Sequence, residues 1–291
     1  FNEEIKKIYY IDSLAGTVDQ FDFHVTNGTL ANRQVLFTLK KHNIARMPDG
    51  MIIDTDAPKQ PTFIIPVEGK KDQFIISLDK ELAIIFWDGE SDKFSIVEKL
   101  SVADDTPDKA DNKFNDAKCD SSGRLWTGTL CINKENIEKT PPVGTLYSFD
   151  SKRQLKGHIS QVRLSNGIAF NDLLKKMYYI DTLKGTIDQF DFDIDNGAIS
   201  NRQVLFTLKK NNIPGMPDGM TIDSDGNLWV AVFGGNRVIK IDGKKPETLL
   251  DTVKLPALQV TSVVFGGPNL DELYVTSAAL EVDGKTPPDN G

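Results

Sequence analysis

The chain has 291 residues, of which 39% are hydrophobic and 26% are charged, and 34 Lys and Arg against 42 Asp and Glu give a net charge of −8. These proportions are typical of globular proteins. The acidic balance argues against nucleic acid or an anionic membrane surface as a partner, because both need a basic face. No apolar run approaches the roughly 20 residues that span a bilayer, so we expect neither a nucleic-acid nor a membrane partner.

The first segment of the chain is repeated later. Residues 1–54 contain FNEEIKKIYYIDSLAGTVDQFDF, NRQVLFTLKK and MPDGMIID, and residues 170–223 contain FNDLLKKMYYIDTLKGTIDQFDF, NRQVLFTLKK and MPDGMTID. A near-duplicate of this quality indicates a recent duplication on top of an older, weaker repeat.

The older repeat is visible in short strand-like runs. Segments such as KKMYYID, GTIDQFDF, GRLWTGTL, GNLWVAVF and NRVIKID are rich in Val, Ile, Phe and Tyr, and Asp-Gly, Asn-Gly and Ser-Gly pairs separate such runs. This pattern is typical of antiparallel hairpins. No long segment keeps the 3.6-residue apolar period of a helix, so we predict an all-β fold.

One element recurs regularly: a polar residue at a tight turn leads into an apolar strand, at Thr62, Asn115, Asn166, Asp218 and Ser262. The spacing of about 44 to 53 residues is the size of one four-stranded propeller blade. Five such starts, with room for one more at the N-terminus, predict a six-bladed β-propeller over residues 1–291 as one domain, in which the first or last blade can be incomplete. A β-sandwich would need no such spacing, and a parallel β-helix has a shorter repeat.

In a propeller, equivalent starts of the innermost strands converge at one mouth of the central channel. Asn115, Asn166 and Asp218 occupy such starts in three successive blades, and their oxygen atoms suit a hard cation, with Ca²⁺ ahead of Mg²⁺ or Mn²⁺. The alternative is a purely structural role, because Asn-Gly and Asp-Gly are common hairpin turns. The shared register across blades favours function.

Other candidates are better explained by structure. Asp120 and Asp223 open turns that precede Trp126 and Trp229, which is a routine use of Asp in turns. The chain has only three histidines and two cysteines, with no metal-type spacing, and we find no P-loop, G-x-S-x-G elbow or serine-hydrolase triad.

The segments NKFNDAKCDSSGRLWTGTL, LSNGIAFNDLLKKMYYID, MPDGMTIDSDGNLWVAVFGGNRVIKI and LLDTVKLPALQVTSVVFGGPNLDELYVTSA resemble the SMP-30/gluconolactonase family, which includes regucalcin and luciferin-regenerating enzymes. The resemblance implies a six-bladed propeller. It also implies a lactonase with one divalent metal, Ca²⁺ first and Zn²⁺, Mg²⁺ or Mn²⁺ as alternatives. By the same resemblance, Asn166 and Asp218 bind the metal, Asp218 is also the proton acceptor, and Asn115, Lys113 and Asn133 lie on the substrate side.

This sequence departs from the family pattern at several of these positions. Lys113 replaces an arginine, Ala117 a glycine and Asn133 an acidic residue, and the family's metal-binding Glu would align about four residues before Phe1. Asp49, in the second copy of the PDG turn, is expected in an inserted loop away from the channel.

Three functions remain open. The first is metal-dependent hydrolysis of a small sugar-type lactone, the second is a calcium-binding regulatory propeller of the regucalcin kind, and the third is a luciferin-regenerating type of enzyme. For each we expect a cytoplasmic monomer.

Overall fold

The computed structural model describes residues 5–12, 17–24, 29–38, 61–88, 94–131, 133, 136–267, 269–278 and 280, and gives only the backbone of those before residue 61. Within this part of the chain the structure is built from strands, and its helical segments are single 3₁₀ turns. The all-β prediction is confirmed. The described residues hold no helix long and apolar enough to cross a membrane.

Three separate sheets have four antiparallel strands each. The first contains β4 (Ile64–Pro66), β5 (Gln73–Leu78), β6 (Glu81–Phe86) and β7 (Ser95–Val102). The second contains β8 (Lys113–Cys119), β9 (Leu125–Leu130), β10 (Gly144–Phe149) and β11 (Leu155–Val162). The third contains β12 (Ser165–Asn171), β13 (Lys176–Asp181), β14 (Thr186–Asp193) and β15 (Ala198–Thr207).

A nine-stranded sheet contains the remaining strands. One part of it is β16 (Met216–Ile222), β17 (Leu228–Phe233), β18 (Arg237–Ile241) and β19 (Leu249–Lys254). The other part is β20 (Gln259–Gly266), β21 (Glu272–Ala278), β1 (Ile5–Asp12), β2 (Thr17–His24) and β3 (Thr29–Thr38). A single residue pair, Phe233 with Gln259, joins the two parts.

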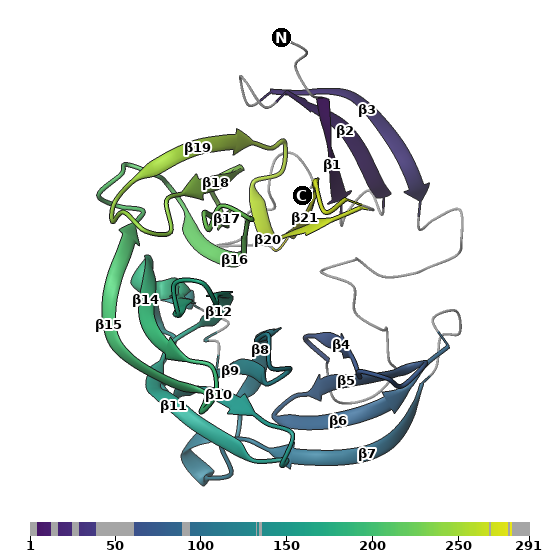
Figure 1. Cartoon of the computed structure of the whole chain (residues 1–291), viewed down its shortest axis with the longest axis vertical. Coiled ribbons are helices and arrows are strands. Elements are labelled where there is room, and N and C mark those ends of the chain that lie inside the picture. The colour runs from purple at the N-terminus through teal and green to yellow at the C-terminus, as the bar shows by residue number, and fades with distance from the viewer. Residues whose placement is uncertain are drawn as a thin grey trace.

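The sheets are arranged around a common centre, and β4, β8, β12, β16 and β20 lie on its inner side (Figure 1). Of the five strand starts that the spacing predicted, Thr62 lies two residues before β4, and Asn115, Asn166, Asp218 and Ser262 lie in β8, β12, β16 and β20. The fold is therefore propeller-like, and the count of six blades and the closure of the ring stay predictions.

The core lies between neighbouring sheets. Trp126 of β9, for example, packs with Met177 and Phe190 of the next sheet, and all three side chains are buried. Apolar clusters also fill the spaces between the first and second sheets and between the third sheet and β16–β18. These clusters fix the relative positions of β8, β12 and β16, because each lies in a sheet that packs against its neighbour.

The near-duplicate segments adopt the same hairpins. Tyr9 pairs with Gln20 as Tyr178 pairs with Gln189, and the irregularities between β2 and β3 match those between β14 and β15. Their neighbours differ. The strand β13 pairs with the antiparallel β12, whereas β1 lies parallel to β21, with Ile8 opposite Leu273.

Candidate functional site

A β-bulge interrupts the inner strand at each of three predicted site residues. The register shifts at residues 114–117 of β8, 165–168 of β12 and 217–220 of β16, around Asn115, Asn166 and Asp218. A bulge adds one residue to a strand and re-aims the side chains beside it. The three residues thus have the same place in three neighbouring sheets.

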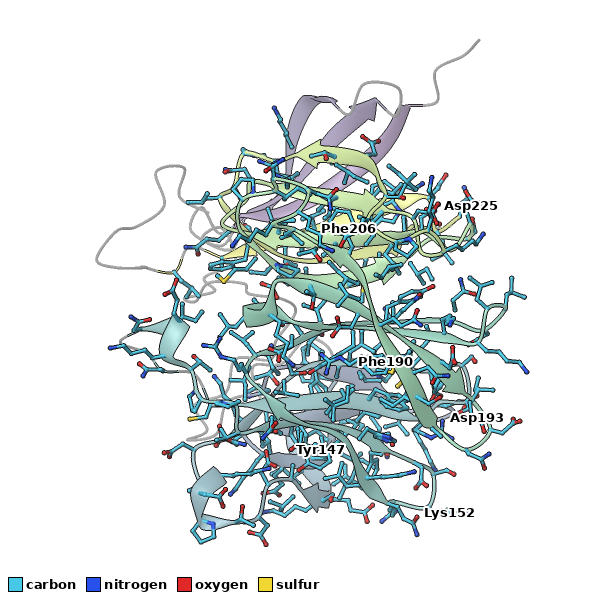
Figure 2. The ribbon with its side chains drawn as sticks, turned by 90° about the vertical axis from the view of Figure 1, so that its left-hand side faces the viewer. Tyr147, Lys152, Phe190, Asp193, Phe206 and Asp225 are labelled. Carbon is cyan, nitrogen blue, oxygen red and sulfur yellow. The ribbon has the colours of Figure 1, made fainter. Side chains whose placement is uncertain are left out.

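All three residues lie near the same end of the molecule. Asp225, in the turn after β16, and Asp193 and Lys152, in or beside the outer turns of the preceding sheets, lie along one edge in the side view (Figure 2). Asp218 is at the opposite end of β16 from that turn. The site residues therefore lie towards the face opposite to Asp225.

Asn115 and Asn166 are in direct contact. The Nδ2 atom of Asn115 donates to the Ser165 carbonyl at 2.7 Å and to Asn166 Oδ1 at 2.8 Å. Asn115 is half-buried and Asn166 is buried. Both hydrogens of the Asn115 amide are therefore used to hold the start of β12 against β8.

Asn166 is connected in the other direction to the strand of Asp218. Its Nδ2 donates to Thr182 Oγ1 at 2.7 Å, and the Thr182 hydroxyl donates to the Pro217 carbonyl at 2.8 Å. Pro217 directly precedes Asp218, so a single hydroxyl joins the side chain of Asn166 to the backbone just before Asp218.

Glycine lets these inner strands approach closely. A Cβ atom on Gly167 would lie 2.7 Å from the Asp218 carbonyl oxygen and 2.9 Å from a methyl carbon of Ile180. A Cβ on Gly219 would lie 2.5 Å from Ser262 Oγ. The glycine of the Asn-Gly and Asp-Gly pairs is thus required by contact between strands, beyond any need of the turn.

The start of β12 is held from behind by Asp181. Its carboxylate accepts the backbone N–H groups of Leu164 at 3.0 Å and Arg163 at 3.3 Å, and its side chain is fully buried. Asp181 is the last residue of β13 and directly precedes Thr182, so two adjacent residues hold the backbone just before β12 and the side chain of Asn166.

Lys113 lies at the first position of β8, beside an open pocket of about 330 Å³. Lys80 and Asp79 line the same pocket from the turn between β5 and β6, and Asp111 and Asn112 line it from the segment before β8. The pocket is thus lined by residues of both charges, and Lys113 lies two residues along the strand from Asn115.

Asn133 lies in the connection that follows β9. Its Oδ1 accepts the Asn136 N–H at 3.0 Å, and its own N–H donates to Thr140 Oγ1 at 3.2 Å. Arg163 anchors this connection by donating from Nε to the Thr140 carbonyl at 3.1 Å. These bonds place Asn133 in a loop attached to the segment before β12, and its role towards a substrate stays a prediction.

The two turn aspartates have the structural role predicted for them. Asp120 Oδ2 accepts Trp126 Nε1 at 2.9 Å, and Asp223 Oδ2 accepts Trp229 Nε1 at 3.1 Å. Each carboxylate also accepts backbone N–H groups of its own turn.

The SMP-30/Gluconolactonase/LRE-like region family matches residues 1–57 and 55–279, which together are nearly the whole chain. The chain belongs to the SMP-30/gluconolactonase family. The first matched region contains the N-terminal copy of the near-duplicate segment, and the second contains the later copy.

Named relatives agree with this membership. The chain is 38% identical to regucalcin of Gallus gallus over 218 residues, which are 74% of this chain and 68% of the relative. It is 39% identical to a solved luciferin-regenerating enzyme, with a TM-score of 0.75 over 96% of this chain and 85% of the other. A calcium-binding regucalcin from Agrobacterium tumefaciens, at 20% identity and a TM-score of 0.64 over 96% of this chain and 84% of the other, shares the fold.

The matched stretches cover only part of the curated relatives. They span 60% of a protein from Sulfolobus acidocaldarius that is 45% identical, over 60% of this chain, and 58% of human regucalcin, which is 42% identical over 60% of this chain.

The residues present fit the divalent cation that the family resemblance implies. The side-chain oxygen of Asn166, and not its side-chain nitrogen, faces Asn115. Asp218 supplies a carboxylate on β16, the next inner strand. Amide and carboxylate oxygens are the donors that Ca²⁺ prefers. Among the described residues, no three or more His, Cys, Asp or Glu side chains form a group that could hold a metal ion, so the fit depends on the amide oxygens.

Two residues of this region were missed from the sequence. Asp116 lies beside Asn115 in the β8 bulge, where burial raises the pKa of its carboxyl despite the hydrogen bond from the Ala117 N–H. Thr182 connects Asn166 to Pro217. The sequence carries a signal for each residue. Asp116 follows Asn115 where glycine follows Asn166 and Asp218, and a hydroxyl residue follows YYID in both copies, as Ser13 and Thr182. Asp49 lies outside the described residues.

Proposed function

We propose that this protein is a divalent-metal-dependent hydrolase of small sugar-type lactones, with Ca²⁺ as the preferred ion and Asp218 as the general base. Membership of the SMP-30/gluconolactonase family supports this class of activity. The observation that carries the proposal is the fixed pair of amides, in which Asn115 orients Asn166 Oδ1 at a bulge beside the strand of Asp218.

The chemistry would divide between the ion and the protein. A bound divalent cation supplies positive charge that polarises a lactone carbonyl and acidifies a water. Asn166 Oδ1 and the Asp218 carboxylate would hold it. Asp218 would accept a proton from the attacking water as the water oxygen bonds to the carbonyl carbon. The ring C–O bond then breaks, and the ring oxygen takes that proton and leaves as a hydroxyl group.

The hydrogen bonds of Asn115 favour a hydroxylated substrate. Both of its amide hydrogens are used by the Ser165 carbonyl and Asn166 Oδ1, so its own Oδ1 is the atom for a substrate contact. An acceptor at this point matches a sugar hydroxyl. Lys113 and the neighbouring pocket would bind further oxygens of the same small molecule, and Asn133 would contact it from its loop. We take the acting unit to be a monomer.

Two other functions have specific support. Regucalcin relatives at 38% and 42% identity favour a calcium-binding protein with little catalysis. The luciferin-regenerating enzyme, at 39% identity and a TM-score of 0.75, favours an enzyme that acts on a luciferin-type heterocycle.

The test is hydrolysis of a panel of sugar lactones by the full chain, after EDTA treatment and after addition of Ca²⁺, Zn²⁺, Mg²⁺ or Mn²⁺. Turnover that EDTA removes and one ion restores supports the proposal. Tight Ca²⁺ binding without turnover of any lactone would overturn it in favour of the regulatory protein. Activity confined to a luciferin-type heterocycle would favour the third function.

A further inference from the structure

The hydroxyl of Thr182 joins Asn166 to Pro217, the residue before Asp218. Thr182 is the first residue of a 3₁₀ turn, Thr182–Lys184, that follows β13, and only 4% of its surface is exposed. Its Oγ1 contacts the side chain of Asn166 on one side and the backbone of Pro217 on the other.

The direction of these bonds follows from the acceptors at each end. The Pro217 carbonyl can only accept, so the Thr182 hydroxyl must donate its single hydrogen there, and Oγ1 must accept from Asn166. The Ser165 carbonyl likewise can only accept, which fixes the Asn115 amide nitrogen in place. Because a backbone carbonyl ends each side of the network, the Asn166 amide has one permitted orientation, with Oδ1 towards Asn115.

We propose that Thr182 is a positioning residue for the cation site. It holds the Asn166 amide with its oxygen available to the ion, and it holds the peptide between Pro217 and Asp218 at a fixed distance from that amide. This inference rests on the proposed metal function for its consequence in binding. Groups that orient a metal ligand by hydrogen bonding commonly change metal affinity by about 10- to 100-fold when they are removed.

Substitution by valine tests this role because it keeps the shape of threonine and removes the hydroxyl. In Thr182→Val, the buried Asn166 Nδ2 and Pro217 carbonyl both lose a partner. The Asn166 amide is then held only by Asn115, so its oxygen is less firmly positioned for the cation. Thr182→Ser keeps the hydroxyl, and the duplicate segment has serine at this position, as Ser13.

The experiment is calorimetric titration of Ca²⁺ into the full chain for the original protein, Thr182→Val, Thr182→Ser and Asn166→Ala. We expect Thr182→Val to weaken Ca²⁺ binding at least about 10-fold and Thr182→Ser to restore most of the affinity. The matched control is Thr129→Val in β9, which removes another fully buried hydroxyl, one that donates to Asp104 in the connection before β8. This control should lower thermal stability and leave Ca²⁺ affinity unchanged.

The outcomes separate the two proposals. If Asn166→Ala loses Ca²⁺ and Thr182→Val retains it, the site stands and the positioning role is wrong. If Thr182→Val and Thr129→Val weaken binding equally, Thr182 acts through general stability and the positioning role is again wrong.

If the original protein binds no Ca²⁺, the proposed metal function fails, and a metal-free measurement decides the inference. Side-chain NH₂ signals of Asn115 and Asn166, followed by NMR after selective ¹⁵N-asparagine labelling, should be protected from hydrogen exchange in the original protein and in Thr182→Ser. Loss of that protection in Thr182→Val alone supports the role of Thr182. Unchanged protection in Thr182→Val overturns it.

Discussion

Asn115 Nδ2 donates to Asn166 Oδ1 across 2.8 Å, between residues 51 positions apart in the chain. The bond joins the bulge of β8 to the bulge of β12. Two amides in contact also limit one another, because the nitrogen of the first fixes which atom of the second faces it. We therefore expect substitutions at these two positions to be coupled.

For Asn166→Ala we expect the larger loss of Ca²⁺ affinity, since it removes a proposed ligand, and for Asn115→Ala a smaller loss. The loss of Ca²⁺-binding free energy in the double variant should be about 1 kcal/mol smaller than the sum of the losses in the two single variants. Calorimetry of the four proteins measures this coupling. Strict additivity would show that the contact has no part in binding.

Asp218→Asn should abolish lactone hydrolysis while the protein stays folded. Loss of a proton acceptor commonly lowers a rate by about 10²- to 10⁴-fold, and weaker metal binding adds to this. Steady-state rates with saturating metal, together with circular dichroism, measure the effect. The control is Asp225→Asn, at an exposed position at the other end of β16–β17, which should keep full activity. Near-normal hydrolysis by Asp218→Asn would remove this residue from the mechanism.

Gly167→Ala should separate β12 from β16. The added Cβ would meet the Asp218 carbonyl oxygen at 2.7 Å, and backbone atoms cannot move aside cheaply. We expect a loss of about 1–3 kcal/mol in the free energy of unfolding, with weaker Ca²⁺ binding. In the control Gly157→Ala, the nearest atom would be at 3.4 Å. Urea denaturation should show little change for Gly157→Ala, and an equal loss in both would contradict the close-approach argument.

Asp104 is a buried carboxylate with several donors. Burial by itself would raise its pKa, but hydrogen bonds from Thr129, Asn112, Tyr147 and Lys109 together hold the pKa below its ordinary value. A carboxyl with a lowered pKa in the folded state stabilises the protein above the unfolded pKa of about 3.9, and this contribution is lost as the pH falls through the folded value.

Asp104→Asn should therefore lower the free energy of unfolding at neutral pH by about 3 kcal/mol, because it leaves buried donors facing an amide. Its stability should also fall less steeply than that of the original protein below about pH 4. Urea denaturation between pH 7 and pH 3 measures both effects. Parallel pH profiles for the two proteins would contradict the assignment.

His158 should be neutral well below the usual range for histidine. Burial, followed by the nearby positive charges of Lys156 and Arg124, lowers its pKa to about 4. Its Nε2 lies 2.7 Å from Ser148 Oγ, and its ring stacks on Trp126 with centroids 4.5 Å apart.

Because the unfolded state takes up a proton near pH 6.5 and the folded state does so only near pH 4, stability should decrease as the pH falls between these values. An NMR titration of the His158 ring measures the pKa directly. In His158→Gln the decrease in the free energy of unfolding between pH 6.5 and pH 4 should be smaller. A measured His158 pKa near 6.5 would contradict the burial of the ring.

Local chemistry made much of the fold predictable from the sequence. Turns such as the one at Asp120 depend on residues within six positions, because the carboxylate bonds its own turn and the Trp126 indole. The near-duplicate segments form hairpins of the same register for the same reason. Spacing alone predicted that Asn115, Asn166 and Asp218 occupy equivalent points, since each of these three residues lies on the first strand of a four-stranded unit.

The tertiary structure decided what lies beside these elements. Only the packing of sheet on sheet brought Thr182 to Pro217, 35 residues further along the chain, with its hydroxyl at 2.8 Å. Likewise, β1 and β13 share nearly one sequence, yet β1 lies parallel to β21 and β13 lies antiparallel to β12. Turn and hairpin bonds are made within a few residues, so a sequence specifies them locally. A strand edge offers the same backbone groups to any partner, and the partner is chosen by the packing of the whole chain.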